Sequence, residues 1–250
     1  MEAAATENGM ERPRMKKSPC LYLMPSTMSD GTVENVIPST NILLASRIRY
    51  FIVENVRTAR RFLRRCDPSI AIDDITFSVL NRHTSPEEIA SMLDPMSAGY
   101  DMAIISEAGC PAIADPGADV VAIAQRKGYR VEPLVGPSSI LMSLMASGFN
   151  GQSFAFLGYL PIDSRERVAR LKEMERRIQN ERQTQIFIET PYRNNRIIAE
   201  LTKALPGRML LCVASDITGE RQSIITRPLS WWATAKYNYD KIPTIFLLYS

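Results

Sequence analysis

The sequence predicts an α/β fold with two sheets, a mostly parallel sheet in the N-terminal half and a mixed sheet in the C-terminal half. Up to about residue 150, short apolar runs alternate with helical patterns, which is typical of a parallel sheet covered by helices. Beyond that point, more of the apolar runs follow one another without a helical pattern between them. Strands joined directly in this way pair antiparallel, so the second sheet is expected to be mixed.

In the N-terminal half, the predicted strands are apolar runs of four or five residues at 20–24, 50–53, 76–80, 102–105 and 130–133. Helical patterns lie at 38–45, 56–65, 118–127 and 137–146. A further helix begins after Ser85, because Ser85 can cap it, Pro86 suits its first position and Glu88 completes a capping box. Gly128 and Gly148 follow two of these helices, where glycine commonly ends a helix.

In the C-terminal half, the predicted strands lie at 154–157, 185–188, 209–214, 222–226 and 244–248. The predicted helices lie at 164–180 and 192–205. We therefore expect an N-terminal domain over 19–150 and a C-terminal domain over 151–250. Residues 1–18 are rich in Ala, Glu, Arg and Lys without periodicity, which predicts a disordered tail.

The composition is that of an ordinary globular protein, with 45% hydrophobic and 23% charged residues. The net charge of +3 is too small to indicate nucleic-acid binding by itself, but it leaves room for a local basic patch. No apolar run approaches the roughly 20 residues that cross a bilayer, and the N-terminus does not resemble a secretory signal. We expect a cytoplasmic protein without membrane contact.

The cysteine and histidine content argues against a metal site. The four cysteines (Cys20, Cys66, Cys110 and Cys212) include no Cys-x-x-Cys pair, and His83 is the single histidine. A zinc site needs about four clustered nitrogen or sulfur ligands, so no metal is expected. The cysteines are interpreted as reduced thiols. A Ser-His-Asp hydrolase would have to use His83, whose polar surroundings disfavour that role.

Two loops are candidates for ligand binding because each follows a predicted parallel strand, and open α/β sheets bind ligands at the carboxyl ends of their strands. The loop 106–117 contains two glycines and two prolines among small residues, which lets a ligand approach the backbone. It contains neither a dinucleotide fingerprint nor a phosphate loop, and a simple tight turn is an equally good interpretation. The loop 135–139 ends in Ser138 and Ser139, which open the next helix or merely cap it. We expect the two loops to converge on one crevice.

The loop 106–117 reads Ser-Glu-Ala-Gly-Cys-Pro-Ala-Ile-Ala-Asp-Pro-Gly. It resembles the Ser-Asp-Ala-Gly-Thr-Pro-x-x-Ser-Asp-Pro-Gly motif of the 16S rRNA cytidine 2′-O-methyltransferases, a branch of the tetrapyrrole-methylase superfamily. Other segments are similar to this branch in the same order, over about residues 19–250. They are Glu-Asn-Val-Arg at 54–57, Gly-Pro-Ser-Ser at 136–139, Gly-Tyr-Leu-Pro at 158–161 and Glu-Thr-Pro-Tyr-Arg at 189–193.

Some positions depart from the family pattern. The segment 24–30 lacks the usual glycine, Asn55 replaces an acidic residue and Tyr192 replaces a histidine. Cys110 stands where the rRNA branch has threonine and the tetrapyrrole enzymes have the aspartate of Gly-Asp-Pro. A tetrapyrrole or precorrin methyltransferase therefore stays open as an alternative, as does a degenerate member that binds cofactor or RNA without catalysis.

The resemblance implies an S-adenosylmethionine-dependent methyltransferase that forms a homodimer and modifies a ribose 2′-hydroxyl in RNA of the small ribosomal subunit. The cofactor residues that it implies are Pro25, Ala108, Gly109, Cys110, Ile113, Ser138, Ser139 and Ala214. A ribose acceptor benefits from a general base. The candidates by position are Glu54, Glu107 and Asp115, each of which has a structural or helix-capping role as its alternative.

Basic and aromatic residues are candidates for RNA contact. At helical spacing, one face of the helix 56–65 carries Arg57, Arg60, Arg61, Arg64 and Arg65. This face is expected to bind RNA phosphates or to be an ordinary solvated surface. The charged helix beginning at 164 is interpreted as a salt-bridged surface helix, and Trp231, Trp232 and the tyrosines at 237–239 as core or dimer contacts rather than base-stacking groups.

Overall fold

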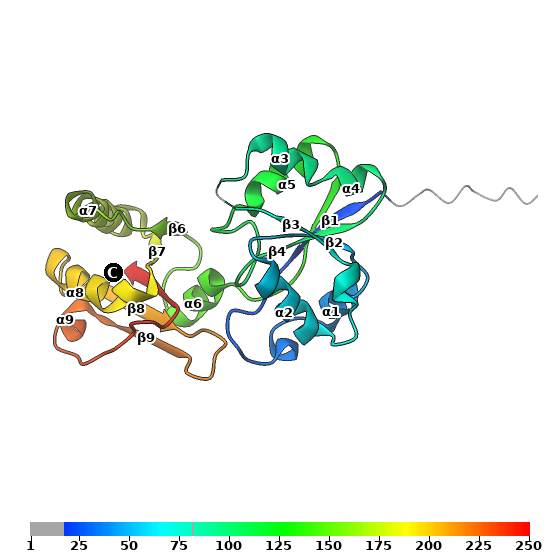
Figure 1. The fold of residues 1–250 in the computed structure, drawn as a ribbon. Coiled ribbons are helices and arrows are strands. Elements are labelled where there is room, and N and C mark those ends of the chain that lie inside the picture. Colours follow the sequence, from blue (N-terminus) through cyan, green and yellow to red (C-terminus); the bar gives the residue numbers. More distant parts are fainter. Residues whose placement is uncertain (1–17, 82) are drawn as a thin grey trace, which may run out of the picture.

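The computed structural model describes residues 18–81 and 83–250, and over these ranges the chain forms two five-stranded sheets (Figure 1). The predicted fold class is confirmed, and all ten strands begin and end within two residues of their predicted limits. The predicted tail lies almost entirely outside the described residues. The division into domains at 150 stays a prediction.

The first sheet is entirely parallel, with the order β3-β2-β4-β1-β5. Its strands are β1 (Cys20–Met24), β2 (Tyr50–Val53), β3 (Thr76–Val79), β4 (Met102–Ile105) and β5 (Arg130–Pro133). Both faces are buried, because alternate residues such as Phe51 and Ile52 enter different core clusters. All five strands therefore end at one edge, which gathers the loops that follow them.

Helices cover both faces of the first sheet (Figure 1). The elements α1 (Ser39–Ala45) and α2 (Val56–Cys66) pack on one face, and α3 (Pro86–Ser91), α4 (Asp94–Ser97) and α5 (Gly117–Arg126) on the other. The capping box before α3 is confirmed, since Ser85 Oγ accepts from the Glu88 amide and the Glu88 carboxylate accepts from the Ser85 amide. Gly128 and Gly148 adopt the left-handed conformation expected after a helix.

The second sheet is mixed, as predicted, with the order β6-β7-β10-β8-β9. Its strands are β6 (Phe154–Tyr159), β7 (Thr184–Ile188), β8 (Leu210–Ser215), β9 (Ser223–Pro228) and β10 (Thr244–Tyr249). Only β6 and β7 pair parallel. One face packs against α7 (Ser164–Glu181), α8 (Asn194–Ala204) and α9 (Leu229–Trp232).

The helix α6 (Ser139–Ser147) covers the other face of the second sheet, although it follows β5 of the first sheet in the chain. Leu144 packs among buried side chains of β7, β8 and β10, and Thr226 of β9 donates a hydrogen bond to the Ser147 carbonyl at 2.9 Å. The loop before α6 therefore leads directly from the edge of the first sheet to the second sheet.

The aromatic residues at 231–239 and the charged helix α7 can be compared with their sequence-based interpretations. Trp232 is buried against Tyr237 and Tyr239, which confirms a core role for these three residues, whereas Trp231 is 42% exposed and lies outside the core. On α7, Glu173 pairs with Arg170 and Arg177 at 2.8 and 3.0 Å. Within residues 18–81 and 83–250, no helix is both long enough and apolar enough to span a membrane.

Candidate active site

The loop after β4 is fastened to the loop after β1 through the carbonyl of Gly109. This oxygen accepts hydrogen bonds from the Ser26 amide at 3.0 Å and from Ser106 Oγ at 2.8 Å. Gly109 has φ +73°, a backbone conformation that residues with a side chain rarely adopt, and a Cβ there would lie 3.2 Å from the Pro137 carbonyl oxygen. The position therefore favours glycine both for its backbone angle and for its close neighbour.

The loop after β5 meets the other two loops at the same edge. Cys110 Sγ donates to the Pro137 carbonyl at 3.4 Å, and a Cβ on Gly136 would lie only 2.3 Å from the Pro25 side chain. Asn41 of α1 holds this loop from the other side, donating to the Val135 carbonyl at 2.8 Å. The predicted convergence of the loops 106–117 and 135–139 is confirmed.

Asp115 organises the turn in the loop 106–117. Its Oδ1 accepts hydrogen bonds from the amides of Ala112 at 2.7 Å and Gly117 at 2.8 Å. Ala112 and Ala114, on either side of Ile113, have positive φ angles of 64° and 60°, which is costly for residues with a Cβ. Burial raises the pKa of the Asp115 carboxyl, although these two amide bonds act in the opposite direction.

We expect Asp115→Asn to leave the free energy of unfolding at pH 7 within about 1 kcal/mol of the wild type, because Asn keeps the Oδ1 acceptor without a buried charge. Asp115→Ala loses both bonds and is expected to cost about 2 kcal/mol. Since the pKa is raised on folding, the contribution of Asp115 is complete below its unfolded pKa and is lost as the pH rises through the folded pKa. Urea unfolding from pH 4 to 7 measures both effects. An Asn variant that is as unstable as the Ala variant would contradict the role of Oδ1.

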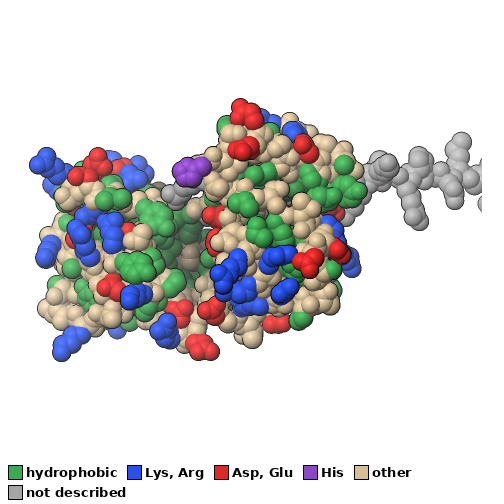
Figure 2. Space-filling model, in the orientation of Figure 1, with side chains coloured by type: hydrophobic (Ala, Val, Ile, Leu, Met, Phe, Trp, Pro, Cys, Tyr) green, Lys and Arg blue, Asp and Glu red, His purple; other side chains and the backbone are tan. Residues whose placement is uncertain are grey.

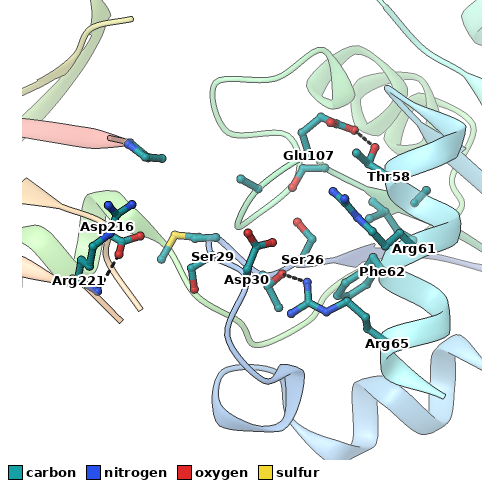
Figure 3. Close-up of a pocket in the computed structure, with 17 residues that line it drawn as sticks. Ser26, Ser29, Asp30, Thr58, Arg61, Phe62, Arg65, Glu107, Asp216 and Arg221 are labelled. Carbon is teal, nitrogen blue, oxygen red and sulfur yellow. Dashed lines mark hydrogen bonds between the residues drawn. The ribbon is translucent and has the colours of Figure 1, made fainter. Parts of the chain in front are cut away.

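Three cavities adjoin at this edge, and Met28 and Ala108 line all of them. We name them by their walls. The loop cavity, of about 390 Å³, is lined by Glu54, Glu107, Gly109, Cys110, Ile113, Asp115, Ser138 and Ser139 among others. The sheet cavity, of about 310 Å³, is lined by Ile188, Glu189, Ala214, Pro243, Thr244 and Ile245 among others. The helix cavity, also about 310 Å³, is lined mainly by the 26–30 loop and α2 (Figure 3).

The cavities bring together most of the residues that the sequence singled out. All three carboxylates and all predicted cofactor residues except Pro25 line at least one cavity. Pro25 lies behind them, with its ring against Gly136. Sequence reasoning missed Met28, Ile245 and the 243–244 segment, which carry no local motif. Tyr159 and Glu189 lie in segments that resemble the family, and that resemblance was the signal for them.

Charge is distributed unevenly among the cavities. Among described residues, the loop cavity has three carboxylates and no lysine, arginine or histidine in its wall. The helix cavity has Arg61, Arg65 and Arg221 facing Asp30, Glu107 and Asp216. Glu107 borders both cavities, and its Oε1 accepts a hydrogen bond from Thr58 Oγ1 at 2.6 Å (Figure 3). The loop cavity therefore suits a cationic group, and the helix cavity a ligand with both polarities.

The arginines of α2 differ in their partners. Arg60 pairs with Asp73 at 2.8 Å, and Arg65 donates to the Gly31 carbonyl and, at 3.4 Å, to Thr27 Oγ1. Within the described part of the chain, no ion pair engages Arg57, Arg61 or Arg64. Figure 2 shows basic side chains gathered over α2, beside the hollow between the two halves. Arg57, Arg60 and Arg64 line a surface groove, whereas Arg61 also lines the helix cavity.

The family follows from comparison with known proteins. A family model described as "Tetrapyrrole (Corrin/Porphyrin) Methylases" matches residues 37–231, most of the chain. The chain therefore belongs to the tetrapyrrole methylases, and the predicted enzyme class, a methyltransferase, is confirmed.

Individual relatives agree with this family. A ribosomal RNA small subunit methyltransferase I from Vibrio cholerae is 28% identical over 93% of this chain and 77% of its own length. The protein of the same name from Pseudomonas aeruginosa is 32% identical over 67% of this chain, and the match spans only 59% of that relative. Among solved structures, the methyltransferase CobJ has a TM-score of 0.62 at 15% identity, covering 94% of this chain and 95% of its own. At this identity the likeness establishes the fold alone.

Proposed function

We propose that the chain uses S-adenosylmethionine to methylate a ribose 2′-hydroxyl in the RNA of the small ribosomal subunit. The proposal rests on one observation: the carboxylate-lined loop cavity adjoins the arginine-bearing helix cavity at the edge of the first sheet. The similar proteins from Vibrio and Pseudomonas are named for methylation of this RNA, which supports the acceptor. A cytoplasmic homodimer is part of the proposal.

The loop and sheet cavities fit the methyl donor. S-adenosylmethionine supplies a reactive methyl group on a positively charged sulfur, and the three carboxylates of the loop cavity favour a cation there. Gly109 lies in the wall of the loop cavity and has no side chain there, so a ligand can approach its backbone closely. In this proposal Ala108, Gly109, Cys110, Ile113, Ser138 and Ser139 hold the cofactor, Ala214 borders it in the apolar sheet cavity, and Pro25 supports Gly136.

Glu107 is the carboxylate best placed to act as the base. It lies between the loop and helix cavities, and Thr58 orients it. It would accept the proton that the hydroxyl loses while the hydroxyl oxygen bonds to the methyl carbon and the carbon–sulfur bond breaks. Asp115 already accepts two amide bonds, and Glu54 lines only the loop cavity of the two. The charged face of α2, with Arg57, Arg60, Arg61 and Arg64, would bind RNA phosphates.

The experiment that tests this proposal has two parts. Calorimetry measures whether S-adenosylmethionine binds the purified chain, and transfer of a labelled methyl group is then measured with small ribosomal subunits lacking this modification. We expect saturable binding and label in a ribose of the small-subunit RNA. The absence of both binding heat and a thermal shift would overturn the choice of donor. Label transferred only to a uroporphyrinogen-type acceptor would overturn the RNA acceptor.

A further inference from the structure

The helix cavity is walled by segments from both halves of the chain. The 26–30 loop and α2 form most of it, and Asp216, Arg221 and Pro243 close it from the second sheet (Figure 3). Ser29 Oγ donates to the Thr218 carbonyl at 3.0 Å, which ties these two sides together. Its volume of about 310 Å³ lies at the lower end of the range for small-ligand sites, roughly 300–1,000 Å³, and suits one nucleotide rather than a duplex.

Ser26 provides an unsatisfied polar group in the wall of this cavity. It is 4% exposed, and its Oγ has no hydrogen-bond partner among the described residues. Its backbone is fixed because the amide donates to the Gly109 carbonyl at 3.0 Å. A buried hydroxyl without a partner costs about 1–3 kcal/mol, and a polar ligand in the cavity would remove that cost.

Among the described residues, two arginines of this cavity have guanidinium groups without a hydrogen-bond or ion-pair partner, Arg61 and Arg221, and Arg61 is the one that lies on α2. Arg65 is held by the Gly31 carbonyl and Thr27, whereas over the described residues Arg61 has neither a hydrogen-bond nor an ion-pair partner. Its side chain extends from α2 toward Glu107 (Figure 3). A guanidinium positioned in this way matches a phosphate group, which it can bind with two parallel hydrogen bonds.

The helix cavity adjoins the proposed donor site. Ser106 and Glu107 line both the helix and loop cavities, and Met28 and Ala108 line the sheet cavity as well. A ligand in the helix cavity would therefore present its reactive group to Glu107 and to the methyl donor at this boundary. An acceptor nucleotide held in such a pocket must leave the base stack, as in other enzymes that act on single nucleotides.

We propose that the helix cavity receives the acceptor nucleotide of a single-stranded RNA segment, with Arg61 binding the phosphate beside the reacting ribose and Ser26 Oγ hydrogen-bonding to the same nucleotide. This inference rests on the proposed function and adds a specific pocket to it. It also divides the α2 arginines into two classes. Arg61 positions the target nucleotide, whereas Arg64 in the outer groove contributes general attraction to RNA.

The test compares Arg61→Ala, Arg61→Lys and Arg64→Ala in methyl transfer to small ribosomal subunits. We expect Arg61→Ala to lower kcat/KM by about 30-fold or more with a large part of the loss in kcat, because a charge-assisted contact at the target is lost. Arg61→Lys should recover only part of this activity. Arg64→Ala should raise KM about threefold at unchanged kcat. Ser26→Ala should lower kcat/KM by about fivefold, in line with one lost hydrogen bond.

Two controls make the outcome decisive. Arg176→Ala, an exposed position on α7, should match the wild type, and the affinity for S-adenosylmethionine should be unchanged in every variant. The melting temperature should be unchanged in the arginine variants and should rise in Ser26→Ala, which removes a buried hydroxyl without a partner. Equal effects of Arg61→Ala and Arg64→Ala, with kcat intact, would overturn this pocket while the proposed function stands. A wild-type protein that binds S-adenosylmethionine but transfers no methyl group to RNA would instead overturn the proposed function and this inference with it.

Discussion

Replacing Gly136 by alanine is expected to destabilise the protein by about 2–3 kcal/mol and to weaken S-adenosylmethionine binding at least about tenfold. The added Cβ would lie 2.3 Å from Pro25 Cβ and 2.6 Å from Pro25 Cγ. A proline ring cannot rotate away, and the Asn41 bond to the Val135 carbonyl holds the loop against Pro25. The loop 135–139 must therefore shift, and Ser138 and Ser139 shift with it.

A rescue experiment isolates this contact. Pro25→Ala retains the Cβ at 2.3 Å, so it should not restore binding in the Gly136→Ala protein, whereas Pro25→Gly removes the three atoms nearest to the new methyl group, Cβ, Cγ and Cδ of Pro25. The double variant Pro25→Gly with Gly136→Ala should recover much of the cofactor affinity, which is a coupling between neighbouring sites. Gly151→Ala is the matched control, because a Cβ there meets no atom within 4 Å. Urea unfolding measures the free energy of unfolding, and calorimetry measures the affinity for S-adenosylmethionine. A Gly136→Ala protein that matches Gly151→Ala would disprove the close approach of the two loops.

The fold was largely predictable because its signals are local. Alternation of apolar runs with helical patterns identified every strand, and the capping box at Ser85 placed a helix start. Short helices such as α4 and α9 were missed, since four residues are too few to show a helical period. The helix predicted at 137–146 begins at Ser139 instead, because Ser138 is its cap and accepts a long 3.5 Å bond from the Leu141 amide.

The candidate site was predictable only where its residues lie in loops after parallel strands. The loops 106–117 and 135–139 lie on the edge where such strands end. Met28, Ile188 and Ile245 come from three separate places in the sequence. Ile188 and Ile245 are partners on the paired strands β7 and β10, and Met28 reaches them from the loop after β1 of the other sheet. The role of Ser26 could not be predicted either. Whether a serine hydroxyl has a hydrogen-bond partner depends on the residues that the fold places around it, and no sequence pattern indicates this.

The structure also separates the roles of residues that the sequence grouped together. Arg57, Arg60, Arg61 and Arg64 share a helix face, but Arg60 is paired with Asp73 and Arg61 lines an inner cavity. Glu107 and Asp115 belong to one motif, but Thr58 orients the first toward the cavity boundary and backbone amides hold the second within its turn. Spacing alone does not reveal such differences, because they depend on the partners that the fold supplies.

The largest catalytic effect that we expect comes from Glu107, the proposed base. Glu107→Gln should lower kcat for methyl transfer by about 100-fold or more, the range for loss of a general base. Gln keeps an oxygen that can accept the hydrogen bond from Thr58 Oγ1, so the side chain keeps its place while it loses its ability to take a proton. The affinity for S-adenosylmethionine should change by no more than about threefold, because Glu54 and Asp115 still line the loop cavity.

Variants around Glu107 distinguish proton transfer from positioning. Thr58→Val removes the 2.6 Å hydrogen bond but leaves the carboxylate, and it should lower kcat by about 5- to 10-fold. In the double variant Thr58→Val with Glu107→Gln, the Thr58 substitution should lower kcat little further. Glutamine cannot accept the proton, so orienting it does not speed the reaction. Glu181→Gln, an exposed position at the end of α7, should behave as the wild type. Single-turnover transfer to small subunits measures each rate. A Glu107→Gln protein with wild-type kcat would move the base to another group, and an equally large loss in Glu54→Gln would assign the proton to both carboxylates.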